Sequence, residues 1–197
     1  NKVDKRITRI KNKIIKYYIG GTVMDRELWD QCTRFHGHEC PGLAIGFRAA
    51  EIAKDKMGLS FSQDEEIVCI TENDACGVDA VQYITGCTMG KGNLIFKNTG
   101  KMAFTFINRK NGDAIRLMLN HDNKEMERDE RQKYILEAPE EEVFKIEKVY
   151  IELPERARNF KTIICEKCHE GAPEHKIRIQ EGKMLCLDCY DEYTRGW

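Results

Sequence analysis

The sequence lacks any long apolar run. Its hydrophobic stretches, such as Ile67-Val68-Cys69-Ile70, are far shorter than the roughly 20 residues that a membrane-spanning helix needs. It also shows no apolar core of a signal peptide near residue 1, and its 32 Lys/Arg against 33 Asp/Glu leave a formal charge of -1. We therefore expect a cytoplasmic protein without a membrane partner. The even charge balance also argues against nucleic-acid binding.

Cysteine, in contrast, is abundant, with nine residues in 197. The count is odd, two Cys-x-x-Cys pairs are present and no secretory segment is visible, so metal binding in a reducing compartment explains these residues better than disulfide bonds. The chain is also longer than one typical domain. We expect an N-terminal domain over residues 1–158 and a small appended unit over residues 159–197.

Two imidazoles and a thiol gather within residues 35–42, which read Phe-His-Gly-His-Glu-Cys-Pro-Gly. On extended backbone, the rings of His36 and His38 would lie on one side, at a spacing suited to a metal ion. Cys40 and Pro41 are expected at the start of a helix over residues 42–57, where the helix N-terminus favours a thiolate. The alternative is a simple strand-to-helix turn with hydrogen-bonded histidines and a buried thiol.

A second junction of this kind follows an expected buried strand over residues 66–71. There Cys76 stands near the start of another helix, and loops at strand ends are where open α/β arrangements build sites. Cys76 is therefore the second candidate thiolate. Cys69 within the strand and Cys32 on an expected helix over residues 25–35 are assigned to the core. Whether Cys32 or Cys87 also binds the metal is left open.

The remaining patterns complete the N-terminal domain. Residues 86–93 are rich in glycine but lack the Walker spacing, so they predict a tight turn with Lys91 as a candidate anion contact. Hydrophobic periodicity predicts a basic amphipathic helix over residues 1–18, packed on the domain or on a second subunit, and a charged helix over residues 122–138. Strands are expected over residues 94–97, 102–108, 114–119 and 144–153.

The C-terminal unit carries two thiol pairs with the spacing of a four-thiolate zinc site. The pairs are Cys165/Cys168 and Cys186/Cys189. A hairpin is expected between them and a closing helix over residues 187–193, which is the order of a treble clef. So short a segment cannot build an adequate core alone, so zinc would supply much of its folding energy. Its acidic and basic residues nearly balance, which favours protein contact over phosphate binding.

Several segments resemble the FmdE family, proteins akin to the FmdE component of molybdenum formylmethanofuran dehydrogenase. The resemblance rests on residues 35–42, 72–82, 86–94 and 100–106. It implies an α+β domain with a mixed sheet flanked by helices, and a metal-binding active site formed by the His and Cys residues of the motif. The appended treble-clef zinc finger also occurs in this family.

Our leading hypothesis is that His36, His38, Cys40 and Cys76 bind one transition-metal ion, zinc or another metal that accepts nitrogen and sulfur ligands. If only three of them bind, the open position would suit a water or Lewis-acid chemistry. A second hypothesis is an accessory subunit or metal-delivery factor of a one-carbon redox complex. A third is a metal-free thiol-redox protein that uses Cys40 and Cys76. A homodimer is expected from the amphipathic N-terminal segment.

Overall fold

The structure is a computed structural model that describes residues 17–19, 22–121 and 125–195. The chain divides into two compact units, Asn1–Arg156 and Ala157–Trp197. Most of the helix predicted over residues 1–18 lies outside the described residues, but its last two positions belong to a strand. β1 (Tyr17–Ile19) pairs with β2 (Thr22–Met24) as an antiparallel hairpin, so the helix prediction is wrong at this end.

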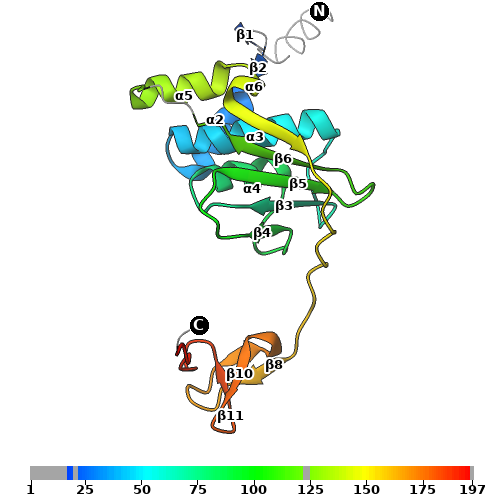
Figure 1. Cartoon of the computed structure of the whole chain (residues 1–197), viewed down its shortest axis with the longest axis vertical. Coiled ribbons are helices and arrows are strands. Elements are labelled where there is room, and N and C mark those ends of the chain that lie inside the picture. The colour runs from blue at the N-terminus through cyan, green and yellow to red at the C-terminus, as the bar shows by residue number, and fades with distance from the viewer. Residues whose placement is uncertain (1–16, 20–21, 122–124, 196–197) are drawn as a thin grey trace, which may run out of the picture. The chain divides into compact units, whose positions relative to one another are not determined.

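A five-stranded mixed sheet forms one layer of the first unit, with the strand order β4-β3-β5-β6-β7 (Figure 1). Its strands are β3 (Ile67–Thr71), β4 (Leu94–Phe96), β5 (Ala103–Asn108), β6 (Ala114–Leu119) and β7 (Phe144–Lys148). β3 and β4 are parallel because α4 (Gly77–Thr85) carries the chain back between them, and the other neighbours are antiparallel. The predicted α+β class with a mixed sheet is confirmed.

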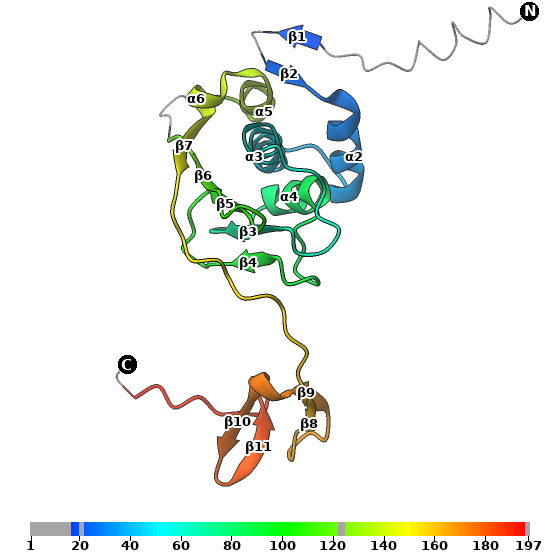
Figure 2. The same ribbon diagram turned by 90° about the vertical axis from the view of Figure 1, so that its right-hand side faces the viewer.

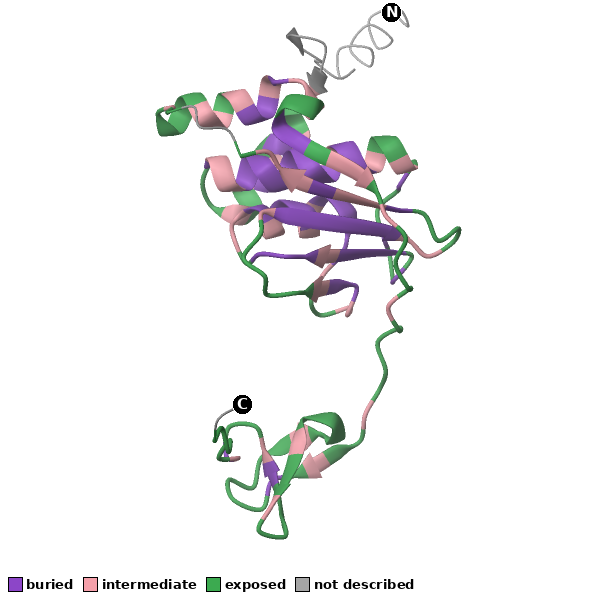
Figure 3. Ribbon diagram, in the orientation of Figure 1, coloured by how far each residue is buried: buried purple, intermediate pink, exposed green. Residues whose placement is uncertain are grey.

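Helices form the second layer, and α2, α3 and α4 lie on one side of the sheet (Figure 2). The remaining helix bounds are α2 (Arg26–His36), α3 (Pro41–Met57), α5 (Arg128–Glu137) and α6 (Glu140–Val143). α3 is the central helix because most of its side chains are buried, and with β5 it forms the continuous buried region of Figure 3. The core therefore lies between α3 and the sheet.

Two glycines allow α3 and α4 to cross at very short range. A Cβ atom placed on Gly46 would overlap the backbone carbonyl of Gly77, and one placed on Gly77 would lie 2.9 Å from the carbonyl oxygen of Gly42. No larger residue fits either position without separating the helices. This close crossing brings the first turns of the two helices together, which matters for the site below.

Two predicted elements are shorter than expected. The strand predicted over residues 144–153 stops at Lys148, because its neighbour β6 begins at Ala114. The carbonyl of Ala114 accepts a hydrogen bond from the N–H of Val149, and β6 has no further residue to pair with the chain beyond it. The helix predicted over residues 122–138 begins only at Arg128. Pro139 follows it and disfavours helical backbone at Ala138, and the chain then forms the short helix α6, which the sequence patterns did not predict.

The second unit contains two small hairpins, with one turn of 3-10 helix, η1 (Glu174–Lys176), between them. They pair β8 (Thr162–Ile164) with β9 (Gly171–Pro173), and β10 (Ile177–Gln180) with β11 (Lys183–Cys186). The closing helix predicted over residues 187–193 is absent from residues 187–195, which form a turn and irregular backbone. A helix this short is marginal unless it packs on a core, and Leu187 and Tyr193 are both exposed.

Among the described residues, no helix combines the length and the apolar character that crossing a membrane would require.

Candidate metal centres

The first candidate centre begins at the end of α2. His36 is the last residue of this helix, because Gly37 adopts a left-handed conformation with φ of 97° and its N–H donates to the carbonyl of Thr33. This C-cap needs glycine, since a Cβ is strained at such a φ. The chain therefore leaves α2 directly after His36, and the next candidate ligand, Cys40, stands at the start of a different helix.

Cys40 then begins α3. It is the N-cap residue, and its Sγ accepts a hydrogen bond from the backbone N–H of Leu43 at 3.2 Å. Pro41 occupies the first helical position, where its missing N–H costs nothing. The prediction that a thiol and a proline open this helix is confirmed. The sulfur is thus held at the positive end of the helix dipole.

Cys76 occupies the equivalent place before α4, at the end of the loop that leaves β3. A Cβ placed on Gly42 would lie 3.7 Å from the Sγ of Cys76 and 3.8 Å from the Sγ of Cys40. The missing side chain of Gly42 therefore leaves room beside both sulfurs. The N-termini of two helices, far apart in sequence, thus place the sulfurs of Cys40 and Cys76 beside one small space, although only Cys40 makes a side-chain capping hydrogen bond.

The ligand atoms of His36, Cys40 and Cys76 all lie within 4.8 Å of one another, and the Nε2 of His36 is 3.9 Å from the Sγ of Cys40. Ligands around one tetrahedral zinc ion are separated by roughly 3.5–3.8 Å, given Zn–N and Zn–S distances of about 2.0 and 2.3 Å. The three side chains therefore fit a transition-metal ion with small adjustments. Two sulfurs and one imidazole nitrogen also match the chemical preference of zinc.

The pKa of Cys76 also favours a bound cation at this cluster. Burial raises the pKa of the Cys76 thiol, and the hydrogen bond and charge of the neighbouring Cys40 raise it further. Two adjacent thiolates repel each other and are poorly solvated here, so the protein alone does not favour both in ionised form. A divalent cation between them would remove this penalty, because metal binding deprotonates its thiols.

Asp79 orients the imidazole. Its Oδ2 lies 2.7 Å from the Nδ1 of His36, from the first turn of α4. A carboxylate only accepts hydrogen bonds, so this contact places the proton on Nδ1 and leaves the Nε2 lone pair free for a metal. Sequence reasoning did not single out Asp79. The available signal was its position three residues after Cys76, which puts both on the first turn of one helix.

His38 is placed differently from the other three predicted ligands. It is exposed, its ring packs against that of His36 with centroids 4.6 Å apart, and it is not among the three clustered side chains. The neighbouring Glu39 is held by Gln132 of α5 at 2.9 Å and by Arg26 of α2 at 3.8 Å. The loop that carries His38 is therefore tied to two helices at the edge of the site.

The remaining cysteines of the first unit lie in the core. Cys32, Cys69 and Cys87 are fully buried, and burial raises the pKa of Cys32 to about 12 and that of Cys87 to about 11. None of the three belongs to the cluster. The Nζ of Lys91, a candidate anion contact, instead donates to the carbonyl of Ser62 at 2.6 Å. The glycine-rich segment is thus a turn anchored to the preceding loop.

The second centre comprises the four cysteines of the C-terminal unit, whose Sγ atoms lie within 4.8 Å of one another. The Sγ atoms of Cys168 and Cys186 are 3.9 Å apart, which is close to the sulfur–sulfur edge of roughly 3.8 Å in a tetrahedral zinc site. Hydrogen bonds from backbone N–H groups lower the pKa of Cys165 to about 6, and the N–H of Cys168 has the largest effect. This geometry fits a structural zinc ion.

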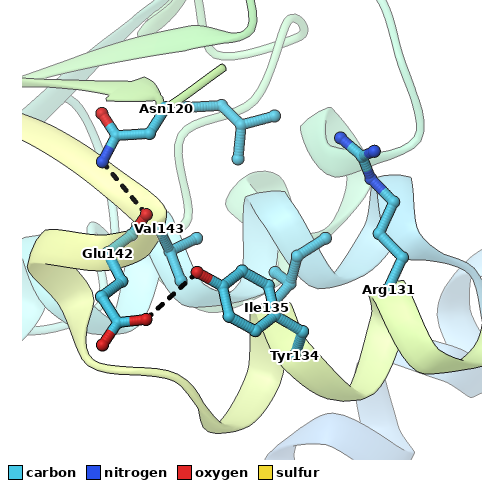
Figure 4. Close-up of a pocket in the computed structure, with 7 residues that line it drawn as sticks. Asn120, Arg131, Tyr134, Ile135, Glu142 and Val143 are labelled. Carbon is cyan, nitrogen blue, oxygen red and sulfur yellow. Dashed lines mark hydrogen bonds between the residues drawn. The ribbon is translucent and has the colours of Figure 1, made fainter. Parts of the chain in front are cut away.

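A small pocket lies elsewhere, between the end of β6 and helices α5 and α6 (Figure 4). It measures about 270 Å³ including its open mouth, and Arg131, Tyr134 and Glu142 are among its lining residues. The hydroxyl of Tyr134 donates to the carboxylate of Glu142 at 3.3 Å. None of the three clustered ligand candidates lines this pocket, so it is separate from the metal centre.

Comparison with known proteins identifies two modules. The family model described as FmdE, molybdenum formylmethanofuran dehydrogenase operon, matches residues 35–160. The model described as the prokaryotic dksA/traR C4-type zinc finger matches residues 158–195. The first match includes the residues of the first centre, and the second includes all four cysteines of the second.

Two individual proteins are similar to the chain. A probable S-adenosyl-L-methionine-binding protein of Archaeoglobus fulgidus is 34% identical over 192 residues, covering 81% of this chain and 51% of the relative. The chain thus spans about half the length of that relative. The crystal structure of a tungsten formylmethanofuran dehydrogenase FmdE-like protein of Syntrophus aciditrophicus has a TM-score of 0.64 at 23% identity, covering 89% of this chain and 96% of the other. This second likeness shows a shared fold. By its sequence match over residues 35–160, the chain belongs to the FmdE family.

Proposed function

We propose that the first unit is a metal-binding module in which His36, Cys40 and Cys76 bind one zinc ion, next to an open coordination position. The observation that carries this proposal is the convergence of the three ligand atoms within 4.8 Å, together with the Asp79 contact that frees the Nε2 of His36. An ion with three protein ligands supplies Lewis acidity to a fourth, exchangeable ligand. His38, at the edge of the site, is proposed as the side chain that closes this position when no substrate is bound.

Other residues of the chain would prepare the ligands for the ion. Asp79 keeps the proton on Nδ1 of His36 and fixes the ring orientation. The helix dipoles of α3 and α4 both direct positive potential at the two sulfurs, since Cys40 and Cys76 occupy the N-cap positions of these helices. The second unit is proposed to bind a structural zinc ion through Cys165, Cys168, Cys186 and Cys189.

Metal counting on variants tests this proposal. The full chain, loaded with zinc and freed of excess ion, should hold two ions per chain, and the variants His36→Ala and Cys76→Ala should hold one. His175→Ala, an exposed histidine outside both clusters, is the matched control and should hold two. Cobalt substitution adds a second measurement, because sulfur ligation gives intense near-ultraviolet charge-transfer bands. Two ions retained at full affinity in both cluster variants would exclude the site.

A second proposed role is that of an accessory or metal-delivery subunit for a one-carbon oxidoreductase complex. The description of the matching family names a formylmethanofuran dehydrogenase operon, and the Syntrophus protein is described as similar to a component of such an enzyme. The finger would then serve as a docking surface. Purification of the full chain from native extract tests this role: a stoichiometric oxidoreductase partner supports it, and recovery of the chain alone argues against it.

A further inference from the structure

We propose that Cys40 and Cys76 form a reversible disulfide when a hydroperoxide reaches the site, and that this oxidation expels the metal ion. The inference rests on the proposed metal site and adds a form of control to it. It differs from a metal-free redox role because the same two sulfurs alternate between binding a cation and binding each other.

The geometry allows the bond. The two Sγ atoms lie within 4.8 Å of each other, and a disulfide requires about 2.05 Å. Rotation about the Cα–Cβ bonds can supply this approach, because the absent side chain of Gly42 leaves space beside both sulfurs. The close crossing of α3 and α4 at Gly46 and Gly77 already holds the two helix N-termini together.

Burial makes the reaction selective within the first unit. Cys76 is partly exposed, so a small oxidant can reach it. Cys40 is 6% exposed, and its role is to attack the oxidised sulfur of Cys76. Cys32, Cys69 and Cys87 are fully buried in the core, so a peroxide dissolved in water does not reach their sulfurs.

The chemistry balances in two steps. The Cys76 thiolate attacks one peroxide oxygen, so the O–O bond breaks, Cys76 becomes a sulfenic acid and hydroxide (or alkoxide) leaves. The Cys40 thiolate then attacks the sulfenic sulfur, the S–S bond forms and a second hydroxide leaves. With hydrogen peroxide, two protons from solvent complete two waters, and the two electrons taken from the sulfurs reduce the peroxide. A dithiol reductant reverses the process by exchange.

Loss of the ion follows from the ligand count. Both sulfur ligands are consumed by the new bond, and only imidazoles remain: His36 of the three clustered side chains and His38 at the edge of the site. Neutral imidazoles without the two thiolates bind a divalent ion far more weakly than the complete site does. Oxidation therefore converts a metal site into an empty one, and reduction with zinc present restores it.

The test uses the full chain, reduced and loaded with two zinc ions, titrated with hydrogen peroxide. Released zinc is measured with a chromophoric indicator, and disulfides are mapped by mass spectrometry after free thiols are blocked. We expect a bond between the peptides containing Cys40 and Cys76, formed together with release of the ion of the first centre and reversed by dithiothreitol plus zinc. Cys76→Ser should lose the bond, and the control Cys32→Ala should keep it.

Other results would overturn the inference. These are sulfinic acid at Cys40 or Cys76 without a bond between them, the bond with both ions retained, or oxidation of the finger cysteines while the first centre stays intact. The ion count before oxidation separates this inference from the proposed function. A reduced chain that holds a single ion, in the finger, refutes the metal site itself, whereas two ions and no Cys40–Cys76 bond refute only the redox control.

Discussion

At the scale of single residues, the proposed metal centre of the first unit depends on hydrogen bonds that prepare its ligands. His36 can offer Nε2 only because Asp79 holds the proton on the other ring nitrogen, across 2.7 Å. The sulfur of Cys40 is fixed by the Leu43 N–H. Ligand side chains prepared in this way lose little conformational freedom on binding, so the supporting residues contribute to affinity without touching the ion.

The first prediction concerns Asp79. Replacing it with asparagine should weaken zinc binding at the first centre by about 10–100-fold, because an amide orients the imidazole less firmly and does not raise its basicity. Competition with a chromophoric chelator measures this affinity. Asp30→Asn, which changes an exposed carboxylate on the surface of α2, is the control. Equal affinities of the two variants would show that the Asp79 contact has no role in metal binding.

The second prediction concerns Glu51, whose carboxyl lies near the buried guanidinium of Arg48 on α3. Burial raises the pKa of Glu51 to about 7, from 4.5. A raised pKa means that the folded state holds the proton more tightly than the unfolded state. The stability associated with this proton is therefore fully present below pH 4.5 and is lost as the pH rises through about 7.

Denaturant unfolding of the zinc-loaded chain at pH 5 and pH 8 measures this effect. The wild-type chain should lose about 2–3 kcal/mol more than Glu51→Gln between the two pH values. Taking the difference between the two proteins cancels the opposite pH dependence of the metal ligands, which both share. Parallel pH profiles would mean that Glu51 titrates as an ordinary surface carboxyl.

At the scale of elements, His36, Cys40 and Cys76 cluster because α3 and α4 begin close to each other. α3 and α4 cross at Gly46 and Gly77, and this crossing sets the distance between the sulfurs of Cys40 and Cys76 at the two helix N-termini. The parallel β3–α4–β4 connection fixes where α4 begins relative to the sheet. Fold and site are therefore coupled through one helix pair.

The third prediction tests this coupling. Gly46→Ala adds a methyl group that overlaps the Gly77 carbonyl, so the helices must separate. Overpacking of this kind costs about 1–3 kcal/mol or more, and zinc affinity at the first centre should fall with it. Gly90→Ala is the matched control, because a Cβ there meets nothing within 4 Å. An unchanged unfolding free energy in Gly46→Ala would contradict the described crossing.

Local signals predicted some elements well and others poorly. The Cys40-Pro41 start of α3 and the strand over residues 114–119 follow from capping and periodicity, which are local. The hairpin of β1 and β2, the helix α6 and the irregular tail after β11 were not predicted, because hydrophobic periodicity does not show whether a segment finds a core to pack on. Asp79 was missed for a similar reason, since its partner is 43 positions away.

At the scale of the whole molecule, the two units are stabilised by different means. The first has a large core between its sheet and helices, whereas the buried cluster of the second consists of Cys165, Leu185 and Cys189. So small a cluster cannot offset the conformational entropy of ordering some forty residues. The structure of the finger should therefore depend on its metal ion, while that of the first unit should not.

The fourth prediction is that metal removal unfolds one unit only. After chelation under reducing conditions, backbone amides of residues 162–189 should lose hydrogen-exchange protection, while those of α3 and β5 keep theirs. Cys189→Ser should reproduce this pattern in the presence of zinc, since three thiolates bind less tightly than four. Loss of protection throughout both units on chelation would show that the first core also requires metal.

The most direct measurement is anomalous diffraction from crystals of the reduced, zinc-loaded chain, with data collected on both sides of the zinc edge. The account predicts two anomalous peaks per chain: one among the four sulfurs of the finger, and one within coordination distance of His36 Nε2 and the sulfurs of Cys40 and Cys76. A single peak in the finger, or a second peak away from these three atoms, would contradict it.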